Sequence, residues 1–176
     1  MAESYARSRF DEDESDTLVQ LVGFQVADER FGVDILMVQE IIRSAPITPV
    51  PNSPSFVEGV INLRGVIIPV IDLRKRLNLF FDSSGMEDIW ILILDIDGRV
   101  TGFIVDKVTE VLKVDEKQVE EAPDIIVSGL DNQYISGVVE VSGHLLILLD
   151  FSRILLIEEV RRLKSTDLGS SAGKYK

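Results

Sequence analysis

Carboxylates at matching positions of an internal repeat are the residues of this chain with the clearest potential for chemistry. Asp72 and Asp150 lie 78 positions apart, and Glu40 and Glu110 lie 70 positions apart. Two aspartates that come from related lobes and share one proton form the dyad of aspartic proteases. Asp72 and Asp150, however, each end an apolar stretch and open a short helical segment instead of lying in a glycine-containing loop. This pattern favours helix N-capping over hydrolysis.

The sequence contains no other pattern of a catalytic or cofactor site. His144 is the only histidine, it follows Gly143 at an expected turn, and the chain has no cysteine. Disulfides, zinc–thiolate sites and thiol catalysis are therefore excluded. The P-loop, G-x-G-x-x-G and EF-hand spacings do not occur either. We expect no enzyme activity, no catalytic residue, no metal site and no cofactor.

Arg64 is the charged residue that the repeat does not explain. It lies in the turn Asn62-Leu63-Arg64-Gly65, and its counterpart in the second copy is Ser142, so the duplicated fold does not require arginine there. One interpretation is a solvated turn charge. The other is a forked donor held at a binding surface, with Glu40 as its ion-pair partner. The nearby run Arg74–Arg76 is expected to be the exposed face of a short helix.

The elements that position these residues form a unit that is built twice. Residues 56–77 align without gaps with residues 134–155, and five of the 22 pairs are identical. Each copy is predicted to form a strand, a tight turn, a second strand and a short helix. An earlier match, 31–42 with 101–112, extends the repeat toward the N-terminus. The segment Ile35–Ile42 fits a short helix or a twisted strand equally well.

The predicted fold is mainly all-β, with two pseudo-repeated five-stranded barrels that share a core. Closed barrels remove exposed strand edges, and a half of about 60 residues is marginal by itself. Apolar runs such as Ile89–Leu94 supply burial between the halves. The expected division is a disordered acidic tail at 1–17, a domain at 18–164 and a flexible tail at 165–176. Within the domain we expect a first barrel at about 18–79, a second at about 89–155 and a closing helix at 151–164.

Charge and hydropathy restrict the partners. The formal net charge is −12, from 30 acidic and 18 basic residues. Nucleic acids and anionic membranes need a basic surface, so neither is expected as a partner. The apolar runs are too short to span a bilayer, and the polar start does not resemble a signal peptide. We expect a cytoplasmic protein with no direct membrane insertion.

The motif residues resemble the CheW family of bacterial chemotaxis coupling proteins. The likeness runs from about Leu18 to Leu163. It rests on Gly59–Gly65 (GVINLRG), Ile68–Arg74 (IPVIDLR), Phe31-Gly32-Val33, Val38–Ile42 (VQEII), Gly102–Asp106 (GFIVD) and Leu145–Asp150 (LLILLD). The combined pattern is specific, although no single piece is.

The resemblance implies two intertwined Src-homology-3-like barrels and a non-catalytic adaptor of two-component signalling. Its implied partners are the cytoplasmic tips of chemoreceptors (methyl-accepting chemotaxis proteins) and the regulatory domain of the CheA histidine kinase. It also implies recruitment to membrane-associated receptor arrays. Receptor contact is expected at the groove between the barrels and the first-barrel segment, with Ile35, Val38, Glu40 and Arg64 as contact residues. Kinase contact is expected at barrel ends, which the motif does not resolve into residues.

Two alternatives to the adaptor follow from the residues. The barrel pair could be a peptide- or small-ligand-binding module outside chemosensing, and Asp72 with Asp150 could form a hydrolase site.

Overall fold

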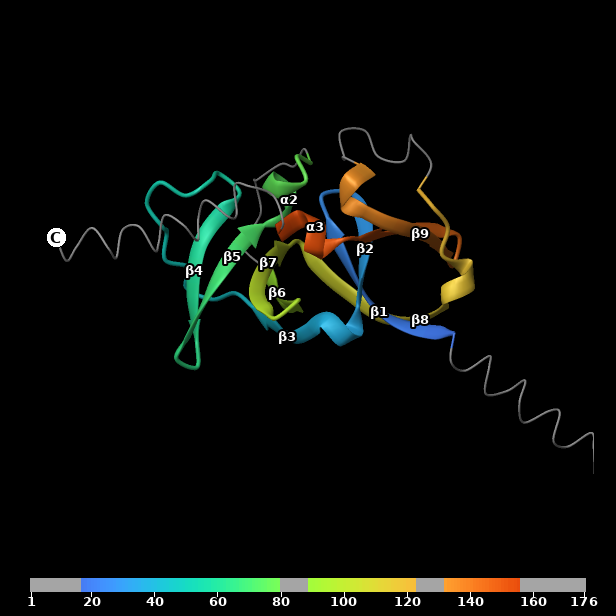
Figure 1. The fold of residues 1–176 in the computed structure, drawn as a ribbon, viewed down its shortest axis with the longest axis horizontal. Helices are drawn as coiled ribbons and strands as arrows, with labels where there is room; N and C mark the ends of the chain where they lie inside the picture. Colours follow the sequence, from blue (N-terminus) through green and yellow to red (C-terminus); the bar gives the residue numbers. More distant parts are fainter. Residues whose placement is uncertain (1–16, 80–88, 123–131, 156–176) are drawn as a thin grey trace, which may run out of the picture.

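The chain is described here by a computed structural model that covers residues 17–79, 89–122 and 132–155. The described elements are two groups of strands with short helices between them (Figure 1). The strands are β1 (Leu18–Val26), β2 (Glu29–Asp34), β3 (Val38–Arg43), β4 (Val57–Leu63), β5 (Val66–Asp72), β6 (Trp90–Ile96), β7 (Arg99–Val105), β8 (Lys107–Asp115), β9 (Ile135–Val141) and β10 (His144–Leu149). The helices are η1 (Ile35–Met37), α2 (Leu73–Arg76), η2 (Glu116–Gln118), η3 (Asn132–Tyr134) and α3 (Phe151–Leu155). The all-β prediction is confirmed.

Two five-stranded sheets lie side by side, with α2 and α3 between them (Figure 1). One sheet, which we call the first barrel, has the order β3-β6-β7-β5-β4, and the other, the second barrel, has the order β8-β1-β2-β10-β9. The predicted boundaries, 18–79 and 89–155, do not follow these sheets. The hairpin β1–β2 belongs to the second barrel and β6–β7 to the first, so each half of the chain gives its first hairpin to the other half's sheet.

The connection between β2 and β3 carries the chain from one sheet to the other. Only η1, three residues long, separates β2 from β3, yet these strands lie in different sheets. The segment 35–42, which the sequence left open between helix and strand, therefore contains both: a 3₁₀ turn that redirects the chain, and then a strand.

The duplication itself appears in the hydrogen bonds. β5 pairs in parallel with β7, and β10 pairs in parallel with β2, at matching places in the two sheets. The amide of Asp72 donates to the carbonyl of Phe56 at 2.7 Å, and the amide of Asp150 donates to the carbonyl of Tyr134 at 2.8 Å. These residue pairs are 78 positions apart, so the two copies superpose in bonding as well as in sequence.

A shared core joins the barrels. Its aromatic centre brings Phe24 within 6.5 Å of Phe151, and Phe151 within 4.9 Å of Phe103, measured between ring centroids. Separate smaller clusters fill each barrel. In β6, Leu92 and Leu94 enter the shared core whereas Ile91 and Ile93 enter the first barrel, and all four are fully buried. The prediction that this strand is buried on both faces is confirmed.

Gly59 marks a close approach of two backbones and gives a testable stability effect. Its φ is +150°, and a Cβ there would lie 2.1 Å from the carbonyl oxygen of Thr48, where Thr48 and Val60 form a two-residue bridge. We expect Gly59→Ala to lower the free energy of unfolding by about 2–3 kcal/mol, because both strain and the clash must be relieved. Urea denaturation measures the change. Gly98→Ala is the control, since its φ of +84° is also strained but its Cβ meets nothing within 4 Å. Equal losses in the two variants would contradict the clash argument.

Some predictions fall outside the described residues. These are the acidic tail up to residue 16, the closing helix beyond Leu155 and the tail at 165–176. None of the helices in the described ranges is long and apolar enough to cross a bilayer.

Candidate functional site

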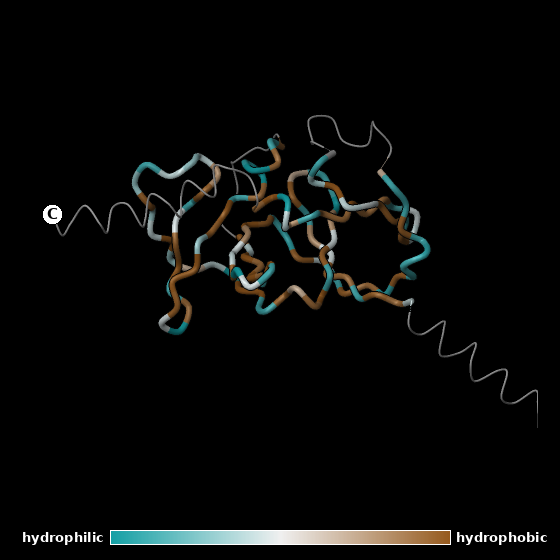
Figure 2. Tube along the Cα trace, in the orientation of Figure 1, coloured by the Kyte–Doolittle hydropathy of each residue, from teal (hydrophilic) through white to brown (hydrophobic). Residues whose placement is uncertain are grey.

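The turn between β4 and β5 holds Arg64 in an unusual backbone conformation. Arg64 has φ +52° and Gly65 has φ +85°, the left-handed pair of a two-residue hairpin turn whose twist matches the strands. The side chain of Asn62 fixes this turn, because its Oδ1 accepts a hydrogen bond of 2.8 Å from the Gly65 amide. The predicted turn is confirmed. In Figure 2 the hairpin is mostly apolar along its strands and hydrophilic at its tip.

The predicted partner of Arg64 is the observed one. Arg64 Nη2 donates to Glu40 Oε1 at 2.7 Å and joins the hairpin tip to β3. The Arg64 side chain is 74% exposed and that of Glu40 is 28% exposed. An ion pair this exposed contributes about 0–1 kcal/mol to stability. The Glu40–Arg64 pair therefore orients two surface side chains but contributes little to the stability of the fold.

Register shows where this pair lies in the first barrel. Glu40 pairs with Ile93, a member of the cluster that fills the barrel, so both side chains are on its inner face. The adjacent residue Leu63 packs against the same cluster. The guanidinium–carboxylate pair thus lies across one open end of the first barrel.

Ile35 and Val38 lie on a different side of the segment from Glu40. Val38 pairs with Leu94 of the shared core, and an irregularity in register separates it from Glu40. Both Ile35 and Val38 are half-buried and pack against the shared core. The structure thus brings Glu40 and Arg64 together and puts Ile35 and Val38 beside the seam between the barrels.

Sequence reasoning missed several apolar side chains that are open to solvent here. Leu36 on η1 is 89% exposed, Val66 beside the turn is 58% exposed and Ile41 on β3 is 38% exposed. Leu36 and Ile41 interrupt the spacing of the half-buried residues, which was the only available signal. We call Leu36, Glu40, Ile41, Arg64 and Val66 the β3–hairpin surface; within it, Ile41 pairs with Leu92 of the shared core and lies on the other face of β3 from Glu40.

The equivalent end of the second barrel lacks the ion pair. There Glu110 and Ser142, the repeat counterparts of Glu40 and Arg64, line a cavity of about 260 Å³ together with Arg30, Lys107 and His144. All five are exposed. The two barrel ends thus differ in their charge arrangement.

The aspartates of the repeat act as helix caps. Asp72 Oδ1 accepts from the Arg74 amide at 3.0 Å, and Asp150 Oδ1 accepts from the Arg153 amide at 3.1 Å. The N-capping prediction is confirmed. Asp72 is also held by the Arg74 guanidinium at 3.2 Å. Each carboxylate thus has its own cationic and amide partners, which is unlike two acids that share a proton.

Arg74 and Arg76 are not on an exposed face, and that interpretation was wrong. Both are buried, and only Lys75 between them reaches solvent. Arg74 also donates to Asp106 Oδ1 at 3.0 Å, and Asp106 Oδ2 accepts from the Ala27 amide at 2.6 Å. The cluster Asp72–Arg74–Asp106 therefore ties α2 to elements of both barrels. Among the described residues no group of three or more His, Cys, Asp or Glu is arranged to hold a metal ion.

A groove opens where the shared core reaches the surface of the first barrel. It has a volume of about 430 Å³ and is lined on one side by the hairpin β4–β5 and on the other by the β6–β7 turn and the end of α3. Most of the lining is apolar, and its deepest members, Val57, Ile71 and Leu155, belong to the shared core.

Comparison with known proteins gives a consistent match. The model of the CheW-like domain matches residues 20–159. Among curated proteins, the chemotaxis protein CheW of Thermotoga maritima is 39% identical over 141 residues, which is 80% of this chain and 89% of that protein. The chemotaxis protein CheW of Treponema pallidum is 35% identical over 152 residues, which is 85% of this chain and 89% of that protein.

A solved structure agrees with the sequence comparisons. The scaffolding protein TtCheW from Thermoanaerobacter tengcongensis is similar with a TM-score of 0.73 and 35% identity, over 80% of this chain and 90% of that one.

Proposed function

This chain belongs to the CheW family of chemotaxis adaptors, and we propose that it couples the cytoplasmic tips of methyl-accepting chemoreceptors to the regulatory domain of the CheA histidine kinase. It acts in the cytoplasm, recruited to membrane-associated receptor arrays, and it is not an enzyme. A module outside chemosensing is not favoured, because the chain matches chemotaxis proteins along most of its length.

The observation that carries the receptor side of this proposal is the Glu40–Arg64 pair. It keeps a guanidinium fork at the surface at almost no cost in stability, with exposed Ile41 on β3, Val66 on β5 and Leu36 on the adjoining η1. Apolar anchors around an oriented arginine are typical of protein-binding surfaces. An amphipathic receptor helix would place its apolar face along these side chains and an acidic or amide group at Arg64. Ile35 and Val38 contribute the half-buried edge of this contact.

The absence of catalysis in this proposal is supported by how the acids are used. Asp72 and Asp150, the only repeat-matched aspartates, cap helices and pair with arginines of their own turn. The oxygens of both carboxylates are thus occupied by backbone amide and guanidinium donors of their own turn. The protein would transmit a signal through binding alone.

The mechanism is bridging between two weak contacts. The β3–hairpin surface takes the receptor, and barrel ends take the kinase domain of the same fold. Contacts of low affinity become effectively intramolecular in an array, so avidity replaces affinity. Receptor state would then reach the kinase as a coupling free energy of about 1–3 kcal/mol.

Arg64→Ala is the direct test of the receptor contact. We expect receptor-fragment affinity to fall by about tenfold or more, because a surface arginine at such a contact is worth at least about 1.4 kcal/mol. Thermal stability should stay nearly unchanged. The measurement is calorimetric titration with a purified receptor fragment, followed by receptor-dependent kinase activity.

Arg153→Ala is the matched control for this test. Arg153 is also an exposed arginine in a surface ion pair, 64% exposed and 3.5 Å from Asp150, but it lies on α3. Parental receptor affinity in Arg64→Ala, or an equal loss in Arg153→Ala, would refute the assignment of the β3–hairpin surface.

A further inference from the structure

A cavity of about 260 Å³ at one end of the second barrel gathers positive charge. Arg30, Lys107 and His144 line this cavity, and Glu110 is the carboxylate in its lining. In the described part of the chain, Arg30 and Lys107 make no ion pair, unlike Arg64 at the first barrel. Unpaired cations that share one cavity in a chain of net charge −12 indicate an anionic ligand.

Strand register places Arg30 and Lys107 on the same face of the sheet. Gln25 of β1 lies opposite Arg30 of β2 on one side and opposite Lys107 of β8 on the other, so the three side chains form a row across adjacent strands. This is the inner face of the barrel, because Leu21, four residues before Gln25 on the same strand, belongs to the cluster that fills it. Two strand spacings, about 10 Å, separate the backbones of Arg30 and Lys107. Their side chains can therefore hold an ion between them, and His144 reaches the same cavity from β10.

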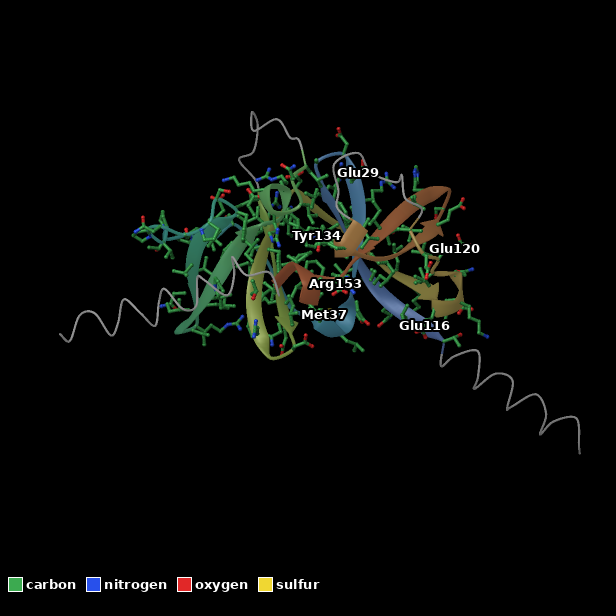
Figure 3. All side chains as sticks on the ribbon, turned by 45° about the horizontal axis from the view of Figure 1, so that its top comes forward. Glu29, Met37, Glu116, Glu120, Tyr134 and Arg153 are labelled. Atoms are coloured by element: carbon green, nitrogen blue, oxygen red, sulfur yellow. The ribbon has the colours of Figure 1, made fainter. Side chains whose placement is uncertain are left out.

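The duplicated fold does not require these basic residues. Their counterparts in the first barrel are all apolar: Val100 for Arg30, Met37 for Lys107 and Val66 for His144. In Figure 3 Glu29, the residue before Arg30, lies toward the top of the molecule, well apart from Met37. The basic cluster is thus a feature of the second barrel alone, and the strand pairing that both barrels share does not account for it.

We propose that this cavity binds a small phosphate monoester, whose phosphate lies between Arg30 and Lys107. A phosphate carries up to two charges and three strong acceptor oxygens, so it suits basic side chains that come from three different strands. The cavity also has an apolar wall, where Leu112 and Val141 are half-buried and Leu145 is 46% exposed. This wall contacts the organic part of the ligand and strengthens the charge interactions beside it. The proposal does not depend on the adaptor function.

NMR titration of the full-length chain with inorganic phosphate and with phenyl phosphate tests the site. We expect saturable shifts of the His144 ring signals, with phenyl phosphate binding more tightly because its ring covers the apolar wall. Arg30→Gln and Lys107→Gln should each weaken the binding of both probes by about tenfold, since each removes a charge-assisted hydrogen bond. Glu110→Gln should strengthen it, because the carboxylate in the cavity lining repels the phosphate.

Lys113→Gln is the matched control, because Lys113 is an exposed lysine on the same strand, β8, but does not line the cavity. Its phosphate affinity should equal that of the parent. Three results would overturn the proposal. The first is a set of shifts that sodium chloride reproduces at the same ionic strength. The second is an equal loss in Lys107→Gln and Lys113→Gln. The third is equal affinity for the two probes, which would mean that the apolar wall does not contact the ligand. Receptor and kinase binding do not enter any of these readouts.

Discussion

Replacing Arg74 by methionine is expected to lower the free energy of unfolding by about 3–5 kcal/mol, the usual cost of removing one partner from a buried ion pair. The side chains of Arg74 and Asp72 are 5% and 4% exposed. Without the guanidinium, the Asp72 carboxylate remains buried, and among the described residues its remaining donor is the backbone amide of residue 74. Asp106, which is 28% exposed, loses a donor but can recruit water. The penalty is therefore mostly that of Asp72.

The measurement is urea denaturation of the full-length chain, with Lys75→Met as the matched control. Lys75 is the next residue on the same short helix and pairs with Glu58, but both side chains reach solvent, with 43% and 31% of their surface exposed. We expect a change within about 1 kcal/mol for that variant. Adding Asp72→Asn to Arg74→Met should recover part of the loss, because the uncompensated charge is removed. A loss below about 1 kcal/mol in Arg74→Met alone would show that the cluster is not the tie between the barrels.

The burial of Arg74 and Arg76 is a point where the sequence was a poor guide. Three consecutive basic residues in an acidic chain normally indicate a solvated helix face. The local sequence does not indicate which side chains would pair with Arg74 or Arg76 inside the protein. The partners come from far along the chain. Arg76 lies between the rings of Phe56 and Tyr134, at 4.8 and 4.9 Å from their centroids, and donates to the carbonyl oxygen of Ile154 at 3.3 Å. These two aromatics are repeat counterparts, so Arg76 occupies a position between the copies that only three-dimensional structure reveals.

The hairpins and the turn were predictable because their signals are local. Asn62 to Gly65 specifies its turn by residue type, and the apolar runs specify buried strands. Which sheet a hairpin joins is not local. The hairpin β1–β2 has the same internal pattern whether it closes its own barrel or the other one, so the sequence alone placed it in the wrong sheet. The family resemblance, which implied intertwined barrels, carried that information.

The candidate site divides in the same way. The Glu40–Arg64 contact was predictable from one unexplained arginine and one carboxylate on the preceding segment, and it is found at 2.7 Å. The high exposure of Leu36 was not, because a leucine between Ile35 and Met37 looks like part of a buried run. It results from the 3₁₀ turn, which points successive side chains about 120° apart and leaves one of three outside.

Reversing the charge of Arg64 separates a binding role from a positioning role for the ion pair. Arg64→Glu puts two carboxylates at the first-barrel end, and we expect receptor affinity to fall by about thirtyfold, equivalent to the loss of about 2 kcal/mol that marks an interface hot spot. The double variant Glu40→Arg, Arg64→Glu restores an ion pair between the same two positions. If the pair served only to hold the hairpin against β3, the double variant would bind like the parent.

We expect that the double variant does not bind like the parent. Its guanidinium would project from position 40 on β3 instead of from the hairpin tip, which lies next to Val66. Calorimetric titration of the receptor fragment and urea denaturation, performed on the parent and on the single and double variants, distinguish the two roles. Stability should drop by no more than about 1 kcal/mol in Arg64→Glu and return in the double variant, since the pair is exposed. Recovery of stability without recovery of receptor affinity assigns Arg64 to direct contact. Recovery of both stability and receptor affinity in the double variant would mean that Arg64 only holds the hairpin against β3. Parental receptor affinity in Arg64→Glu would show that the β3–hairpin surface does not contact the receptor.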